Sequence, residues 1–294
     1  DGNTMKSLNG RNVRLNEYAV ALKKFAASKE APFADQFHQL VDVWGTNKPN
    51  ESFAASFAAA QTLAKNDKLD GVEHLRAFLA AQKKLPVTMM GDPVHPGPTG
   101  QLTMAAALLK DLGAEPFVSS VVMTGEEILQ VKGCKVQAIK GDDKNTIAFT
   151  RLDECVPFPI PDDARAVLPL FPTILDLSQY TLTLKGQTAS IVLKIDGVEV
   201  AKLTGAELEK GVNLTAFDKG PIAAQGKAIL AAVAAKEALV SQARTQSKAA
   251  IAPGADPGLK TKFDALLKQI DEADARIRAA AKPKMLKFEL SFAK

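Results

Sequence analysis

The sequence of 294 residues predicts an α/β fold in which helices dominate the first third and short strands follow. Apolar residues recur at helical spacing between residues 15 and 25 and again after residue 100. Beyond Gly113, short segments rich in β-branched and aromatic residues alternate with Gly, Asp and Pro. The stretch 223–250 is rich in alanine, and 259–277 carries a second apolar stripe. These patterns predict four segments, at 1–115, 116–222, 223–282 and 283–294.

Before residue 90, three helices are expected. The first carries Leu15, Ala19, Leu22 and Phe25, the second spans Phe53 to Ala64, and the third runs from Gly71 to Lys84. His74 lies on the third helix, where a role in packing or at the surface is the favoured interpretation.

The segment after Gly113 is predicted to be β-rich. Asp196-Gly197 supplies a two-residue turn between two strands, and Thr204 with Glu207 forms a capping box for a short helix. Tyr180 is the one aromatic residue there that we expect to expose a polar group. The region is either a sandwich that binds carbohydrate or protein or, as we favour, a structural domain that accompanies the first segment. Four strands are expected at Phe117–Met123, Gln130–Ile139, Asn145–Leu152 and Tyr180–Leu184.

The last two segments are predicted to be a helical hairpin and a strand. The apolar stripe of residues 259–277 either binds a partner helix or, as we favour, packs on the helix before it across a short connection. Leu286, Phe288, Leu290 and Phe292 alternate with polar residues, which predicts a strand that returns to the β-rich segment as an edge.

Composition narrows the classes of function. Basic residues number 37 and acidic residues 33, and because they are interspersed, nucleic-acid binding is not expected. No apolar run reaches the roughly 18 to 20 residues that cross a bilayer. The sequence contains neither a Cys-x-x-Cys nor a His-x-x-x-His pair, the spacings typical of zinc ligands. Neither a metal nor a cofactor is therefore expected. Cys134 and Cys155 either pair or, as we favour, stay unpaired.

The most informative stretch is Asp92-Pro93-Val94-His95-Pro96. An imidazole can take a proton from a serine only if a partner holds its other ring nitrogen, and Asp92 is placed to be that partner for His95. The alternative is that Asp92 closes a local turn and His95 is a surface residue. Pro98, Met104 and Leu108 indicate that the pair precedes a helix.

The block Asp-x-x-His-Pro-x-x-x-Gly followed by an Ala/Leu/Met helix resembles the last conserved block of the SGNH, or GDSL-type, esterase and lipase family. The resemblance covers roughly residues 1–115 and implies the C-terminal half of a flavodoxin-like hydrolase domain. It gives Asp92 the role of orienting carboxylate and His95 that of general base. It also implies that Ala31–Phe37 is a late strand of the domain; His38, just beyond, is assigned no chemistry.

The family pattern also requires a Gly-Asp-Ser block with the nucleophile and later Gly and Asn blocks for the oxyanion hole, and none of them occurs here. We therefore expect a fragment that lacks its N-terminal part and that alone is inactive, because the base has no hydroxyl to activate. The resemblance implies ester hydrolysis, with an acylated carbohydrate or another small ester as substrate, in a secreted or periplasmic protein. The alternative function is a non-catalytic binding or scaffolding module.

Overall fold

The computed structural model describes all residues except 1, 44–57, 59, 82–95, 140–144 and 293–294. The chain forms two compact units, and the boundary between them passes through three strands, β1 (Phe117–Met123), β5 (Gln179–Leu184) and β8 (Val212–Asn213). Unit 1 comprises residues 1–117, 160–180 and 213–217, and unit 2 comprises the rest. Residues 160–180 and 213–217 thus group with the N-terminal part of the chain.

Unit 1 is built mainly from helices. The long helix α5 packs against α2, η1 and α6, and α4 also packs against η1. Small and branched apolar side chains fill the space between them, with Leu75, Ala107 and Val167 fully buried. Its described helices are α1 (Gly2–Ser28), α2 (Gln36–Val43), α4 (Val72–Ala81), α5 (Pro98–Asp111), η1 (Asp162–Val167), α6 (Thr173–Asp176) and η2 (Leu214–Ala216).

Two of the three helices predicted before residue 90 are confirmed, as α1 and α4. Most of the helix predicted over Phe53 to Ala64 lies outside the described residues, and residues 60–63 are helical.

The predicted strand Ala31–Phe37 is wrong. Residues 31–35 have no regular structure, and α2 begins at Gln36. The physical reason is local: the carboxylate of Asp35 accepts a hydrogen bond from the backbone N–H of His38 at 3.0 Å, which is a helix N-cap. The described part of unit 1 has no sheet of its own beyond the ends of β1, β5 and β8 and a bridge at Pro96, so a flavodoxin-like sheet stays a prediction.

Unit 2 carries most of two sheets, in which the pairs β1–β2, β3–β4, β4–β9, β6–β7 and β6–β9 are antiparallel. One has the strand order β2-β1-β5-β8 and the other β3-β4-β9-β6-β7. Gly133, at φ 69°, separates β2 from β3. The single segment predicted over Gln130–Ile139 is therefore divided into two strands, one in each sheet. The strands are β1 (Phe117–Met123), β2 (Ile128–Lys132), β3 (Cys134–Ile139), β4 (Thr146–Asp153), β5 (Gln179–Leu184), β6 (Ser190–Ile195), β7 (Val198–Thr204), β8 (Val212–Asn213) and β9 (Met285–Phe292).

The predicted hairpin and its cap are confirmed. Asp196 and Gly197 join β6 to β7 with φ values of 47° and 77°, the two positive values of a type I′ turn. Thr204 caps α7 (Gly205–Lys210) by accepting from the N–H of Glu207 at 3.2 Å, and the Glu207 carboxylate accepts from the N–H of Thr204 at 2.7 Å. Local chemistry thus fixes both ends of β7.

The last strand is correctly predicted, but its place at an edge is wrong. β9 lies in the middle of its sheet and pairs with β4 on one side and β6 on the other. Phe288 is fully buried, and its ring stacks on that of Phe149 in β4 with centroids 5.0 Å apart. The C-terminal strand therefore joins the two halves of this sheet.

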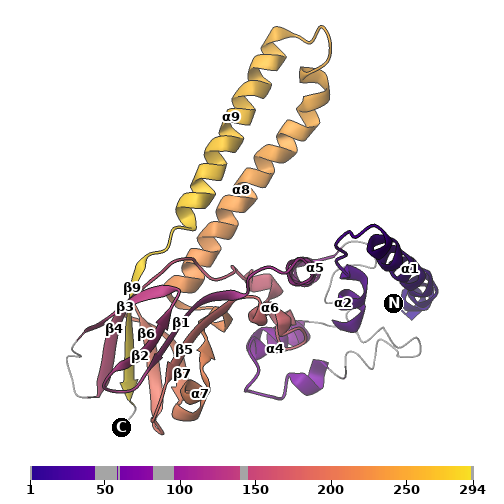
Figure 1. Ribbon diagram of the computed structural model, residues 1–294. Coiled ribbons are helices and arrows are strands. Elements are labelled where there is room, and N and C mark those ends of the chain that lie inside the picture. The colour runs from indigo at the N-terminus through magenta and orange to yellow at the C-terminus, as the bar shows by residue number, and fades with distance from the viewer. Residues whose placement is uncertain (1, 44–57, 59, 82–95, 140–144, 293–294) are drawn as a thin grey trace. The chain divides into compact units, whose positions relative to one another are not determined.

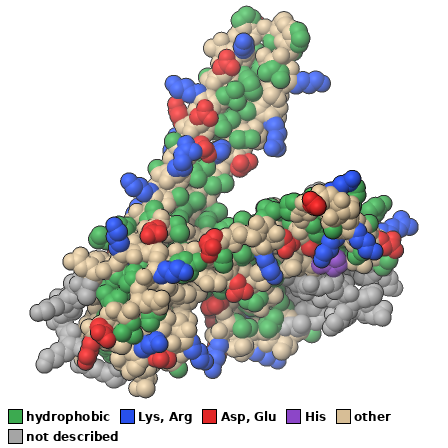
Figure 2. Space-filling model, viewed as in Figure 1, with side chains coloured by type: hydrophobic (Ala, Val, Ile, Leu, Met, Phe, Trp, Pro, Cys, Tyr) green, Lys and Arg blue, Asp and Glu red, His purple; other side chains and the backbone are tan. Residues whose placement is uncertain are grey.

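The predicted helical hairpin is confirmed as α8 (Gly220–Ala250) and α9 (Pro257–Ala280). The two helices lie side by side and extend beyond the strands of the same unit (Figure 1). Ala243, Ala250, Phe263 and Leu266 form the core between them, so the stripe packs within the chain, as favoured. Charged side chains of both signs are interspersed along the outside (Figure 2).

Near the base of the hairpin, one carboxylate receives two cations. Lys236 Nζ and Arg278 Nη1 each lie 2.7 Å from a different oxygen of Asp274. These hydrogen bonds hold the pKa of the Asp274 carboxyl below its ordinary value.

Candidate functional site

The predicted catalytic pair, Asp92 and His95, lies outside the described residues. The structure describes the chain again from Pro96, the residue that follows His95 in the sequence. Two hydrogen bonds from Gln101 fix this point: its backbone N–H donates to the Gly97 carbonyl at 2.9 Å, and its side-chain amide donates to the Pro96 carbonyl at 3.1 Å. The chain segment directly after the predicted pair is thus bound to the first turn of a helix.

That helix, α5, confirms the prediction that the pair precedes a helix. Gly97 is the N-cap and Pro98 occupies the first turn, where a missing N–H costs no hydrogen bond. Its buried face is made mostly of small residues, because Thr99, Gly100, Thr103 and Ala106 are buried there beside the larger Leu102. Leu108, one of the residues whose spacing indicated the helix, is 39% exposed. Small side chains let the first turns of α5 lie close to their neighbours, which holds the start of this helix in place.

A second Asp-x-x-His pair, Asp35 and His38, is fully described. The Asp35 carboxylate lies 2.7 Å from Nδ1 of His38, and Asn16 Oδ1 lies 2.7 Å from Nε2. The pair forms because Asp35 is the N-cap of α2 and the imidazole three residues later folds back onto it. Sequence reasoning assigned His38 no chemistry because it placed the preceding residues in a strand. The N-cap signal at Asp35 was the sign that could have identified the pair.

His74, the remaining described histidine, lies on α4 and is half-buried. This position agrees with the packing or surface role favoured from the sequence.

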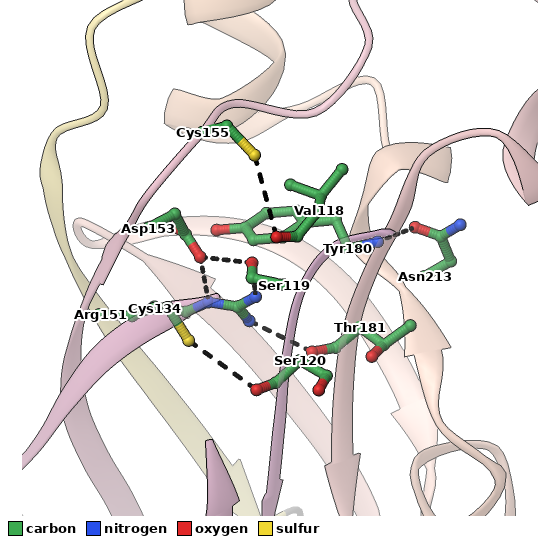
Figure 3. Close-up of polar contacts among 10 residues, drawn as sticks. All are labelled: Val118, Ser119, Ser120, Cys134, Arg151, Asp153, Cys155, Tyr180, Thr181 and Asn213. Carbon is green, nitrogen blue, oxygen red and sulfur yellow. Dashed lines mark hydrogen bonds and ion pairs between the residues drawn. The ribbon is translucent and has the colours of Figure 1, made fainter. Parts of the chain in front are cut away.

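Unit 2 contains a buried ionic network that the sequence analysis did not identify (Figure 3). Arg151 on β4 is fully buried and donates from Nε to the Asp153 carboxylate at 2.8 Å. It donates from Nη2 to the hydroxyl of Ser119 at 2.6 Å, and from Nη1 to the Thr181 carbonyl at 3.2 Å. The Ser119 hydroxyl donates to the same Asp153 oxygen at 2.6 Å.

This network joins the two sheets of unit 2. Arg151 and Asp153 belong to β4, whereas Ser119 belongs to β1 and Thr181 to β5, in the opposite sheet. A buried guanidinium is tolerated when a carboxylate and further acceptors compensate its charge, as here. The carboxylate that accepts from the Ser119 hydroxyl is itself paired with the Arg151 guanidinium, and all three side chains are buried, so the arrangement supports a structural role.

Two free thiols flank this network (Figure 3). The thiol of Cys134 donates to the Ser120 carbonyl and that of Cys155 to the Val118 carbonyl, each at 3.8 Å. Burial raises the pKa of the Cys134 thiol, and the charge of Arg151 opposes this only in part. Burial also raises the pKa of the Cys155 thiol. Both therefore stay protonated near neutral pH, which makes them poor nucleophiles.

The expectation that Tyr180 exposes a polar group is wrong. The side chain is 1% exposed, and its backbone N–H donates to Oδ1 of Asn213 at 3.2 Å. Tyr180 therefore offers no exposed platform for a sugar.

Among the described residues, His, Cys, Asp and Glu form no group of three or more that could hold a metal ion. In the same part of the chain, no helix is both long and apolar enough to cross a membrane.

Comparisons with known proteins place the fold. No protein-family model and no curated protein matches the sequence. The fold is a mixed α/β arrangement with two sheets and many helices. A solved structure described as a gut microbial diltiazem-metabolizing enzyme is similar to this chain, with a TM-score of 0.56 and 20% sequence identity. The match covers 84% of this chain and 68% of the other. The similarity thus concerns the fold of most of this chain.

Proposed function

We propose that the protein is a serine-type ester hydrolase of the SGNH/GDSL kind, in which Asp92 orients His95 and His95 is the general base. The observation that carries the proposal is the Asp-x-x-His-Pro block directly before α5, a helix whose first turn is held by Gln101. The similarity in fold to a diltiazem-metabolizing enzyme, which acts on a small molecule, adds support.

The chemistry follows the general route for such pairs. His95 takes a proton from a serine hydroxyl as that oxygen attacks the ester carbonyl, and Asp92 stabilises the imidazolium that forms. His95 then returns the proton to the leaving alcohol, and water hydrolyses the acyl-enzyme. The serine comes from a Gly-Asp-Ser block that these 294 residues do not contain. Acylated carbohydrates are the proposed substrates.

The position of Asp92 and His95 in the sequence fits a loop site of this kind. Catalytic residues commonly lie on loops that a rigid element positions, and α5 is such an element. The described pair Asp35–His38 shows that the same spacing can bring a carboxylate within 2.7 Å of Nδ1 in this chain. That contact is the one the proposed mechanism needs between Asp92 and His95.

The competing function is a binding or scaffolding module in which Asp92 and His95 do no chemistry. The experiment that separates the two uses the full-length protein. A hydrolase is expected to hydrolyse p-nitrophenyl acetate and to react covalently, at one serine, with a fluorophosphonate probe. Absence of both reactions from the folded protein would favour the module.

A control variant guards against hydrolysis by an unrelated group. Asp92→Asn keeps the size of the side chain but removes the charge that orients the imidazole. By comparison with other triads, it should lower kcat by roughly 10⁴-fold and leave the far-ultraviolet circular dichroism unchanged. Unchanged hydrolysis in this variant would show that Asp92 is not the orienting residue.

A further inference from the structure

His38 is held between two oxygen-bearing side chains that come from different segments of unit 1. Nδ1 lies 2.7 Å and 2.9 Å from the two carboxylate oxygens of Asp35, just before α2. Nε2 lies 2.7 Å from Oδ1 of Asn16 on α1. The histidine side chain is 32% exposed and that of Asp35 is 22% exposed, so protons from solvent reach the ring.

A count of donors and acceptors shows what this arrangement requires. A carboxylate and an amide oxygen only accept hydrogen bonds, whereas a neutral imidazole has one N–H donor and one lone pair. Only an imidazolium donates at both nitrogens. We propose that Asn16, His38 and Asp35 form a pH-dependent clip, which ties α1 to α2 when His38 is protonated and releases it when His38 is neutral.

The charges around the ring agree with this proposal. The backbone N–H of Asp35 donates to the carboxylate of Asp111 on α5 at 2.7 Å, so α5 brings a second negative charge to the clip. On α1, Lys23 lies two helical turns from Asn16. The residues three and four positions from Asn16 carry no charge; they are Asn12, Val13, Ala19 and Val20.

The clip matters because the part of α1 whose side chains the structure describes, residues 13–28, buries little surface. Between residues 13 and 28 of this helix, Ala19 is buried, Ala26 is partly buried and the rest are exposed, with Tyr18 at 68% and Phe25 at 62%. A helix that buries so little depends on its few polar contacts. Loss of the bond at Nε2 should therefore be measurable in the amides of α1.

The test is hydrogen–deuterium exchange of residues 13–28 in the whole chain at pH 5.5 and pH 8.5, corrected for the intrinsic exchange rate. Because one hydrogen bond to a charged group is lost as the pH rises, we expect the protection factors of the α1 amides to fall by roughly fivefold or more. His38→Gln and Asn16→Ala should each remove this difference. Asn16→Asp, which adds a carboxylate at Nε2, should enlarge it, and the control His74→Gln should retain it.

Two results would overturn the clip. One is equal protection at both pH values in the unmodified protein, which would mean a neutral ring that accepts from the Asn16 amide nitrogen. The other is a pH difference that survives in Asn16→Ala. Asn16 is exposed on α1, so its truncation leaves the fold intact and keeps the test decisive even if His38→Gln does not fold. None of these outcomes depends on the proposed ester hydrolysis.

Discussion

The buried network of Arg151 gives a stability prediction that can be worked from the structure. Asp153→Asn keeps the shape of the side chain but removes the negative charge 2.8 Å from Nε of Arg151. The guanidinium is fully buried and then lacks its counter-charge, so the variant should lose about 3–5 kcal/mol of unfolding free energy. Replacing both members, as in Arg151→Met with Asp153→Leu, should recover much of this loss, because two apolar side chains carry no desolvation cost.

The assay has to report on the strands of unit 2. The one tryptophan, Trp44, lies outside the described residues, so its fluorescence is not a suitable probe of this network. Urea unfolding followed by hydrogen exchange of β4 and β1 amides measures the free energy where the network lies. The partly exposed pair Lys287–Glu289, 2.9 Å apart on β9, provides the control: Glu289→Gln should cost less than about 1 kcal/mol. Equal small losses in Asp153→Asn and Glu289→Gln would show that the network does not hold the sheets together.

Three further predictions concern local features of unit 2. The pKa of Asp274 is lowered in the folded state, so its ionised carboxylate stabilises the fold above the ordinary carboxyl range, and this stabilisation is lost as the pH falls through the folded pKa. Asp274→Asn should therefore lower the melting temperature at pH 7 but not at pH 2. Equal losses at the two pH values would contradict this. Thr204→Ala should cost about 1 kcal/mol in urea unfolding, and a loss in Thr204→Ser as large as this would argue against the cap. Gly205→Ala would place a Cβ 2.0 Å from the Gln187 carbonyl oxygen and should prevent native packing of α7. The control Gly226→Ala, within α8, should be neutral or stabilise the protein by up to about 1 kcal/mol. A Gly205→Ala variant that folds stably would contradict the close approach of Gly205 to Gln187.

The features that the sequence predicted well are those set by a few neighbouring residues. Asp196-Gly197 determines its turn because both positions need positive φ, and Thr204 with Glu207 determines the start of α7 through two reciprocal bonds. Residue alternation correctly gave β9, because Leu286 and Phe288 are buried while Lys287 is half-exposed. Alternation does not show which strands lie beside β9, because a central strand and an edge strand of a sheet with one solvent-exposed face have the same pattern. The place of β9 therefore could not be predicted.

The candidate site shows the same limit. Helix α5 after His95 was predictable from Pro98 and the apolar spacing, and it is confirmed. The Asp35–His38 contact was missed because a strand was assigned where an N-cap begins α2. Arg151 and Asp153 lie two residues apart on one strand and therefore on one face, which is a sign of a buried ion pair. Their partners on β1 and β5 are distant in sequence, and only the fold brings them together.

We propose that His95 is the base of an ester hydrolase, and the three histidines of the chain allow a direct test. The measurement is kcat/KM for p-nitrophenyl acetate hydrolysis by the full-length protein, for alanine variants of His95, His38 and His74. The proposed mechanism predicts a loss of roughly 10⁴-fold or more for His95→Ala, because a triad loses most of its effect when one member is removed. It predicts less than a few-fold change for the other two variants. An unchanged rate in His95→Ala, or an equal loss in His38→Ala, would contradict the assignment.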